Sequence, residues 1–159
     1  PSGVNWEDLA SDQVIYSNRA QSSGDGSGVI NSGVSDCTIV ADLLSSYTVS
    51  GIETRQVGIV FRVDGASYWK VTANAYNNTF YIKNPSGDSV ASTSVTINQG
   101  VEIQIKVVLS GNSITAWLND ANEISTNSST QNTATKHGFW LFRRTVAPYP
   151  WCDNFTITA

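Results

Sequence analysis

The segment QVGIVFRVDGASYWKVTANAYNNTFYIK, residues 56–83, contains three stretches in which apolar and polar side chains alternate. The alternation runs through 56–64, 67–76 and 79–83, and it is interrupted at Asp64-Gly65 and Asn77-Asn78. A period of two is typical of β-strands, and Asp-Gly and Asn-Asn pairs favour tight turns. The segment therefore predicts three consecutive strands joined by short turns.

The same period continues on both sides of this segment. Further strands are predicted at 14–18, 37–46, 89–95, 101–109, 113–119, 138–144 and 152–158. Turn residues such as Asn84-Pro85-Ser86-Gly87 separate them, and helical spacing is confined to the opening residues 5–13. About ten short strands predict an all-β fold, an antiparallel β-sandwich or jelly roll.

Composition limits the classes of function. The chain of 159 residues suits one domain, 1–159, and its formal net charge is −4. Its few Lys and Arg residues are scattered, so we do not expect nucleic-acid binding. The sequence has no apolar run long enough to cross a bilayer, so membrane insertion is not expected. Because the chain begins at Pro1 without Met, we expect neighbouring domains in a longer or processed protein.

The two cysteines, Cys37 and Cys152, leave two alternatives open. Neither they nor His137, the single histidine, have zinc-binding spacing. A Cys37–Cys152 disulfide would close a loop of roughly 115 residues and add roughly 4–5 kcal/mol in a chain-entropy model. Strand alternation argues against this disulfide. Cys37 is expected on the same face of its strand as the core residue Ile39, whereas Cys152 is expected on the face opposite to Phe155.

Alternation also predicts which side chains face outward. Trp69 and Val71 are expected inside, whereas residues 138–144 leave open which pair, Trp140 with Phe142 or Phe139 with Leu141, faces out. Aromatic rings cover the C–H face of a sugar, and amides and cations bind its hydroxyls. Strand propensity or burial against another domain explains the same residues without a ligand. The candidate ligand-binding residues are Arg62, Tyr68, Lys70, Asn74, Tyr76, Tyr81, Gln104, Trp117, Trp140 and Arg143.

Four motifs carry a resemblance to a known superfamily. They are DCTIVADLLSS (36–46), VGIVFRVDGASYWKVTANAYNNTFYIKN (57–84), GVEIQIKVVLSGNSITAWLND (100–120) and HGFWLFRRTVAPYPWCDNFTIT (137–158). In this order they resemble the concanavalin-A-like lectin/glucanase superfamily, in its laminin-G-like branch. The resemblance covers residues 36–159, and residues 1–35 are expected to add an N-terminal strand and loops. It implies a jelly-roll sandwich of two antiparallel sheets.

The resemblance also implies a structural calcium ion near the final strand. Asp153 matches an Asp of that strand that helps to bind the ion together with residues from the N-terminal region. In this chain that region contains Asp25, within the Gly-rich loop SSGDGSGV at 22–29. Calcium prefers carboxylate and carbonyl oxygens, but Asp residues in loops also cap turns. Asp153 and Asp25 are therefore the candidate metal ligands.

Catalysis is not expected from these residues. The glucanase members carry an acidic E-x-D-x-x-E triplet on one strand, whereas Glu102 here alternates with Gln104 and Lys106. Asp36 and Asp42 would lie roughly 20 Å apart along a strand, too far to act together on a glycosidic bond. A lone histidine before a strand, such as His137, is expected to be a loop residue and not a base.

These observations favour a non-catalytic carbohydrate-binding or adhesion module with a glycan or polysaccharide partner. The resemblance implies a secreted, surface or phage-appendage protein, in an extracellular, cell-surface or virion-associated location. The first alternative is a structural β-sandwich that mediates assembly without a ligand. The second is a polysaccharide-degrading enzyme.

Overall fold

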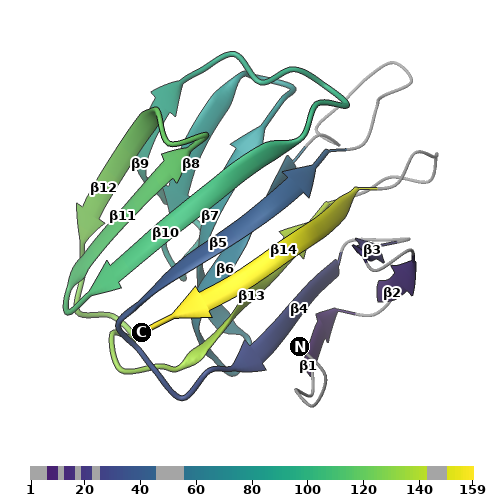
Figure 1. The fold of residues 1–159 in the computed structure, drawn as a ribbon. Coiled ribbons are helices and arrows are strands. Elements are labelled where there is room, and N and C mark those ends of the chain that lie inside the picture. The colour runs from purple at the N-terminus through teal and green to yellow at the C-terminus, as the bar shows by residue number, and fades with distance from the viewer. Residues whose placement is uncertain (1–6, 11–12, 17–18, 23–25, 46–55, 143–149) are drawn as a thin grey trace.

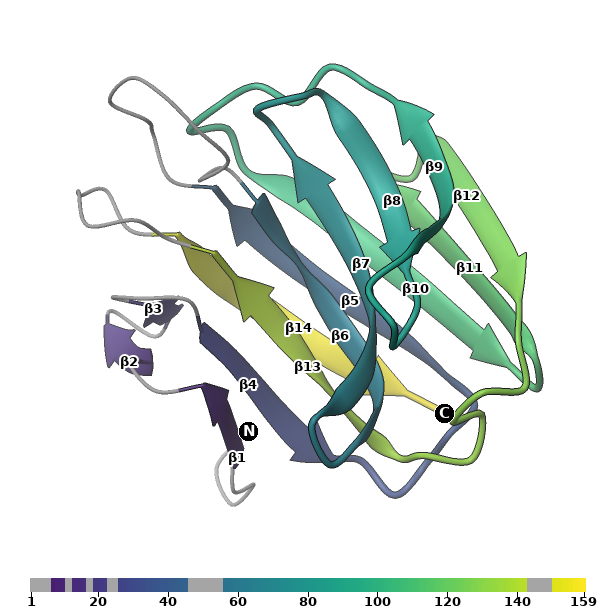
Figure 2. The same ribbon diagram turned by 180° about the vertical axis from the view of Figure 1, so that it is seen from behind.

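Two antiparallel seven-stranded sheets pack face to face (Figures 1 and 2). The computed structural model describes residues 7–10, 13–16, 19–22, 26–45, 56–142 and 150–159. All regular elements in these ranges are strands. The prediction of an all-β antiparallel sandwich is therefore confirmed.

The first sheet has the strand order β1-β4-β13-β6-β7-β8-β9. Strands β6, β7 and β8 are the three consecutive strands predicted from residues 56–83, and they pair antiparallel in sequence order. The strands span Glu7–Ala10 (β1), Gly26–Asn31 (β4), Lys136–Leu141 (β13), Gln56–Asp64 (β6), Ser67–Asn74 (β7), Thr79–Lys83 (β8) and Ser89–Ser94 (β9).

The second sheet has the strand order β12-β11-β10-β5-β14-β3-β2. Strand β5 pairs with both β10 and β14, so segments far apart in the chain become neighbours, as in a jelly roll. The strands span Asn122–Asn127 (β12), Ser113–Leu118 (β11), Ile103–Ser110 (β10), Cys37–Leu44 (β5), Trp151–Thr158 (β14), Arg19–Ser22 (β3) and Gln13–Tyr16 (β2).

Alternating apolar side chains from both sheets form the core. On the second sheet Ile39 and Ile105 are fully buried, and on the first sheet Ile59 and Phe80 are fully buried. Burying such a side chain stabilises the fold by roughly 1.5–3 kcal/mol. The residues predicted to face inward in the segment 67–76 are also buried: Trp69, Val71 and Ala73 of β7, and Ala75 just after it.

The first sheet is covered on its outer face as well. Val29, Val60 and Val63 form a second buried cluster there, with Tyr68 and Trp140 packed against it. Alternation predicts a solvent-exposed face at Asn74 and Tyr81, and this part of the prediction is wrong. Both side chains are buried, because neighbouring side chains on this face cover them.

Arg62 lies between the sheets and not on the outside as predicted. Its φ of 51° belongs to a β-bulge, because the pairing of β6 with β7 shifts between Phe61 and Asp64. One extra residue changes the phase of alternation, so the side chain turns inward. There it is fully buried, and its Nη2 donates to the carbonyl oxygen of Gly111 in the turn between β10 and β11 of the opposite sheet.

His137 is a buried strand residue, so its expected place in a loop is wrong. Its Nε2 lies 2.9 Å from the carbonyl oxygen of Val34, and the backbone N–H of Arg62 donates to its Nδ1 at 3.3 Å. These two partners fix the neutral ring with its proton on Nε2. Burial lowers the pKa of His137, the charge of Arg62 adds to this effect, and the Val34 contact opposes it.

Cys37 and Cys152 are both free and buried. Cys152 pairs with Leu43 at the other end of β5 from Cys37, a separation of roughly 20 Å at the rise of a strand. That distance excludes the disulfide alternative. Burial raises the pKa of the Cys37 thiol to about 11 and that of Cys152 further, so both remain neutral thiols.

The burial of His137 predicts a pH-dependent stability. The folded pKa lies below the unfolded value of about 6.5, so the unfolded chain binds the proton more readily. The free energy of unfolding should be highest above that pH and should fall as the pH drops through the folded pKa. Denaturant titrations between neutral and mildly acidic pH measure this. An equal decline in His137→Gln would contradict the assignment.

Gly138 and Gly58 are required where β13 and β6 approach their neighbours. A Cβ at Gly138 would lie 1.8 Å from the carbonyl oxygen of Gly28, and one at Gly58 would lie 2.0 Å from that of Val71. Gly138→Ala should therefore destabilise the protein by at least ~2 kcal/mol, because backbone must move. Ser92→Ala, on exposed β9, is the control and should change stability by less than ~0.5 kcal/mol in the same denaturant titration. Equal stability of the two variants would contradict this packing.

Candidate functional site

The predicted ligand-binding residues are divided between the two faces of the sandwich. Five lie on the outer face of the first sheet and two, Gln104 and Trp117, on that of the second. Tyr76 is 53% exposed in the turn after β7, Arg62 is buried between the sheets, and Arg143 lies outside the described residues. The five on the first sheet are Tyr68, Lys70, Asn74, Tyr81 and Trp140.

Trp140 belongs to β13 of the first sheet, a strand labelled in Figure 2. Its ring stacks on Phe142 with centroids 5.5 Å apart, and the Nζ of Lys70 lies 3.5 Å from the ring centroid. Phe139 and Leu141 are buried in the core, which settles the alternative that the sequence left open in favour of an outward Trp140.

Lys70 reaches Trp140 across an intervening strand. Lys70 belongs to β7 and pairs with Val60 of β6, while Trp140 of β13 pairs with Gly58 of β6. Gly58 has no side chain, so nothing on β6 separates the ammonium group from the indole at that position. An ammonium over an indole contributes about 0.5–1 kcal/mol at a partly exposed site. We call Tyr68, Lys70, Trp140 and Phe142 the Trp140 face.

The Trp140 face combines apolar rings with a cationic donor. Trp140, Phe142, Tyr68 and Lys70 are all half-buried, so part of each side chain remains accessible. Beside them, the hydroxyl of Tyr81 donates to Oε1 of Gln56 at 2.8 Å. An indole of this kind can cover the C–H face of a ring-shaped ligand while an ammonium group donates to its oxygens.

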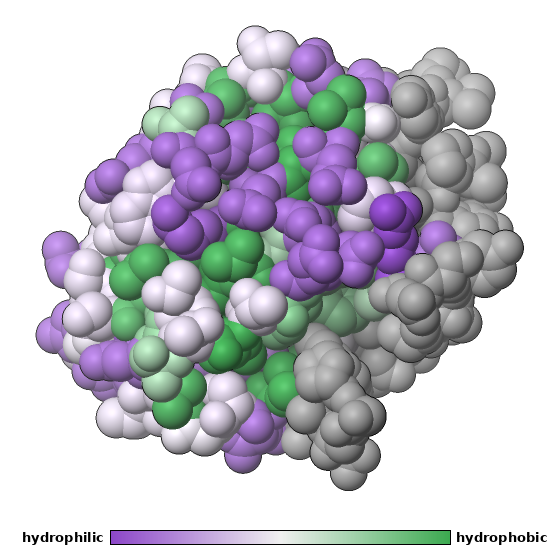
Figure 3. Space-filling model, viewed as in Figure 1, coloured by the Kyte–Doolittle hydropathy of each residue, from purple (hydrophilic) through white to green (hydrophobic). Residues whose placement is uncertain are grey.

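The outer face of the second sheet has a different character. Figure 3 shows hydrophilic side chains in a band across it, with smaller hydrophobic areas on either side. Trp117 belongs to this face: its Nε1 donates to Glu123 at 3.0 Å, and Lys106 lies 4.8 Å from its centroid. Lys106 also pairs with Asp120 at 2.6 Å. Trp117 therefore contacts charged side chains on this face, through a hydrogen bond to Glu123 and a cation–π contact with Lys106.

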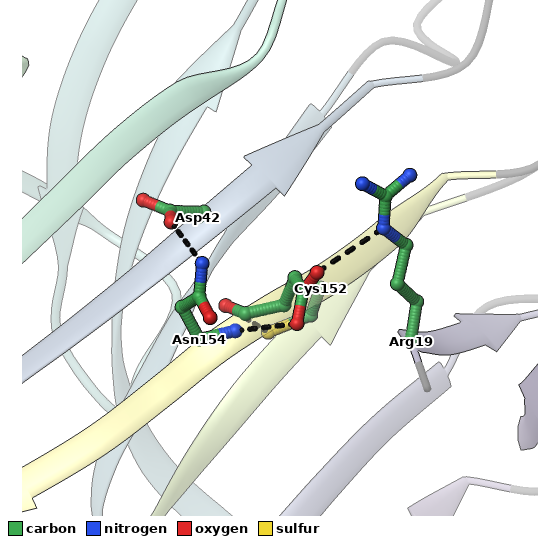
Figure 4. Close-up of polar contacts among 5 residues, drawn as sticks. Arg19, Asp42, Cys152 and Asn154 are labelled. Atoms are coloured by element: carbon green, nitrogen blue, oxygen red, sulfur yellow. Dashed lines mark hydrogen bonds and ion pairs between the residues drawn. The ribbon is translucent and has the colours of Figure 1, made fainter. Parts of the chain in front are cut away.

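Asp153 is part of a hydrogen-bonded group on the same face (Figure 4). Its Oδ2 accepts from Nε of Arg19 at 3.1 Å, and its Oδ1 accepts from the backbone N–H of Asn154 at 2.8 Å. Arg19 also stacks on the ring of Trp151, with Cζ 4.0 Å from the centroid. Both oxygens of Asp153 are thus engaged by donors.

The described surroundings of Asp153 do not fit a calcium site. Calcium takes six to eight oxygen ligands, whereas this carboxylate forms an ion pair with the guanidinium of Arg19. Within the described ranges, no three or more His, Cys, Asp or Glu side chains gather where they could hold an ion. Asp25, the other candidate ligand, lies outside the described residues.

The structure adds a carboxylate pair that the sequence did not reveal. Asp42 of β5 pairs directly with Asp153 of β14, so their side chains are neighbours. Asp42 accepts from Nε2 of Gln104 at 3.0 Å and from Nδ2 of Asn154 at 2.8 Å. All four carboxylate oxygens accept hydrogen bonds, so the two side chains are held within one hydrogen-bonded network.

Strand register explains why the pair was missed. The pairing of β14 with β5 shifts between Asp153 and Thr156, where Asn154 has a φ of 48°. Alternation alone gives the face of a residue and not its partner on the next strand.

In the described part of the chain, no helix is long and apolar enough to cross a membrane.

No protein-family model matches the sequence, and no curated protein matches it. Three similar solved structures are the carbohydrate-binding module CBM66 from Bacillus subtilis, the exoplasmic/lumenal domain of VIP36 bound to Ca²⁺ and Man3GlcNAc, and a candidate glycosyl hydrolase from Parabacteroides distasonis ATCC 8503. For CBM66 the TM-score is 0.76 at 15% identity, and the match covers 97% of this chain and 95% of that one.

The other two structures are similar over most of their length. For VIP36 the TM-score is 0.67 at 11% identity, with 96% and 85% of the two chains covered. For the Parabacteroides protein it is 0.61 at 12% identity, with 98% and 99% covered. At these identities the comparisons establish the fold. The chain therefore has a jelly-roll β-sandwich fold, as its motifs predict.

Proposed function

We propose that this protein is a non-catalytic carbohydrate-binding domain and that its ligand packs on the Trp140 face. The observation that carries this proposal is the half-buried indole of Trp140, which has the ammonium of Lys70 and the ring of Phe142 as neighbours. Two similar structures support the choice of ligand class: a carbohydrate-binding module and a domain bound to a mannose-containing glycan.

The chemistry of the face matches a sugar ring. The indole removes a C–H face from water, and each Å² of apolar surface buried contributes roughly 25 cal/mol. Lys70 donates to ring or hydroxyl oxygens. Tyr68 and Trp140 both pack against the buried Val29–Val60–Val63 cluster, which supports them from below. Such a site would bind a glycan or polysaccharide by ring stacking and hydrogen bonds, and this binding needs no titrating group.

Hydrolysis is the less favoured function. A candidate glycosyl hydrolase among the similar structures is the observation in its favour. The carboxylate pair Asp42–Asp153 is on the sheet opposite to the Trp140 face, and its oxygens are engaged by Arg19, Gln104 and Asn154. A binding role in an extracellular, cell-surface or virion-associated protein, adhesion included, requires no such pair.

Trp140→Ala should weaken binding to a polysaccharide ligand by at least ~10-fold, because a central aromatic contact is removed. The matched control is Trp117→Ala, which removes an indole under a lysine from the opposite sheet. That control should leave the affinity within about twofold. Affinity electrophoresis against a panel of polysaccharides, followed by calorimetry, measures both variants, and thermal melts verify that they are folded.

Three outcomes of this experiment decide between the functions. Loss of affinity in Trp140→Ala alone supports the proposal. Equal affinity in Trp140→Ala and the wild type removes the Trp140 face as the site. Binding to no polysaccharide, together with self-association through this face, would favour a structural domain that mediates assembly.

The calcium expected at Asp153 and Asp25 has its own test. Because Arg19 and Asn154 already occupy the Asp153 carboxylate, we expect the same melting temperature in excess calcium and in EDTA. A ligand that binds the folded state raises this temperature. A calcium-dependent rise that disappears in Asp153→Asn, but not in the control Asp64→Asn, would establish the ion at this position.

A further inference from the structure

A cavity of about 230 Å³ lies on the side of the sandwich where the edge strands β9 and β12 meet. Figure 2 shows these two strands side by side at one edge of the molecule. Its lining includes Trp69, the turn after β8, Val90 of β9, and residues 126–128 and Thr130 around the end of β12. In the first sheet, β6, β7 and β8 separate β9 from β13, so the cavity shares no residue with the Trp140 face.

Hydrogen bonds fix the first wall, the turn after β8. The backbone N–H of Asn84 donates to the carbonyl oxygen of Asp88 at 3.0 Å, and that of Asp88 donates to Oδ1 of Asn84 at 2.9 Å. The N–H of Gly87 donates to the carbonyl oxygen of Asn84 at 2.9 Å. Pro85 and Ser86 are therefore presented to the cavity from a closed, preorganised turn.

The second wall, after β12, is fixed in the same way. The N–H of Ser128 donates to the carbonyl oxygen of Asn112 at 2.8 Å, and the N–H of Thr130 donates to Oγ of Ser128 at 3.1 Å. The indole N–H of Trp69 donates to the carbonyl oxygen of Thr130 at 3.1 Å, which ties the wall to β7. Walls that are ordered before binding lower the entropic cost of holding a ligand.

The lining is neutral and offers hydroxyl and amide groups. Ser86, Thr126 and Asn127 contribute hydroxyl and amide groups to the lining, and Ser86 and Asn127 are exposed to solvent. A hydroxyl can both donate and accept, and an amide offers both groups. Pro85, Val90 and Trp69 supply apolar surface beside them. A neutral, polyhydroxylated ring fits this mixture, whereas an ionic ligand would have no opposite charge in the lining.

The size of the cavity limits the ligand to a small one. Pockets for drug-sized molecules begin at about 300 Å³, so 230 Å³ suits a single ring. We propose that this cavity is a second carbohydrate subsite, which holds one neutral sugar ring of a glycan. The choice of ligand class rests on the proposed function, but the site itself is independent of Trp140.

Nitrogen-15 NMR of the whole chain tests this proposal. The probes are neutral gluco-, manno-, galacto-, xylo- and fructo-oligosaccharides, titrated into the wild type and into Trp140→Ala. We expect the indole N–H of Trp69 and the backbone amides of Ser86 and Asn127 to shift in both proteins. Thr126→Val combined with Ser86→Ala should weaken this response by about tenfold, because two hydrogen bonds are removed. The control Thr115→Val, on the outer face of β11, should not.

Each outcome separates the two sites. Shifts at the cavity in both proteins, weakened by the Thr126 and Ser86 changes, support the subsite. Shifts confined to the Trp140 indole and its neighbours overturn the subsite and leave the proposed function intact. Shifts at the cavity alone retain the subsite and overturn the Trp140 face. No shift at either place with any probe overturns both.

Discussion

The β-bulge at Arg62 determines which side chains of the first sheet face the core. Before it, Ile59 and Phe61 point inward and Val60 points outward; the extra residue then changes the phase, so Val63 joins Val60 in the outer cluster. Arg62 itself is turned between the sheets, where it bonds to Gly111 and, through its backbone, to His137. This polar contact joins one end of each sheet, and the outer cluster that supports Trp140 depends on the same phase change.

Holding Arg62 there has a cost that the surrounding contacts must offset. Its Nε and Nη1 have no hydrogen-bond partner within the described residues, and burial lowers the pKa of its guanidinium, although nearby Asp36 opposes this. A buried cation with unpaired donors is destabilising unless neighbouring groups compensate. The carboxylate of Asp36 accepts from the N–H of Gly111, so it holds the turn whose carbonyl group receives Arg62. The bulge and the β10–β11 turn therefore stabilise one another.

The two outer faces differ because their aromatic rings have different neighbours. Both Trp117 and Trp140 lie beside a lysine, which would make them equivalent candidates by composition. Glu123 accepts a hydrogen bond from Trp117, and Asp120 pairs with the lysine beside it. Trp140 instead stacks on the ring of Phe142 and lies opposite Gly58 on the next strand. A ligand at Trp117 would compete with an ion pair and a hydrogen bond to Glu123, whereas a ligand at Trp140 would meet the Lys70 ammonium and the ring of Phe142.

Periodicity in the sequence predicted ten of the strands and most of the core, because burial on one face of a strand repeats every two residues. It did not predict β1, β3, β4 or β12, and β1 lies where the sequence has helical spacing. It placed Ile39, Ile105 and Trp69 correctly. It failed at Arg62, where a residue with positive φ changes the phase, and it did not reveal the pairing of Asp42 with Asp153 next to the bulge at Asn154. Neither bulge has a glycine to mark it. The sequence did not reveal the cavity either, because β9 and β12 are separated in the chain and come into contact only in the folded protein.

Two separate sites on one small domain would favour polymers over free sugars. A single ring on the Trp140 face, or in the cavity, must offset the whole entropic cost of association by itself. Four strand spacings separate β13 from β9, which is about 19 Å at ~4.8 Å per strand. A glycan chain that spans this distance binds its second ring at a high effective concentration, without any new contact. Its affinity then exceeds that of either ring alone, and selection for chain length follows from the spacing of the strands.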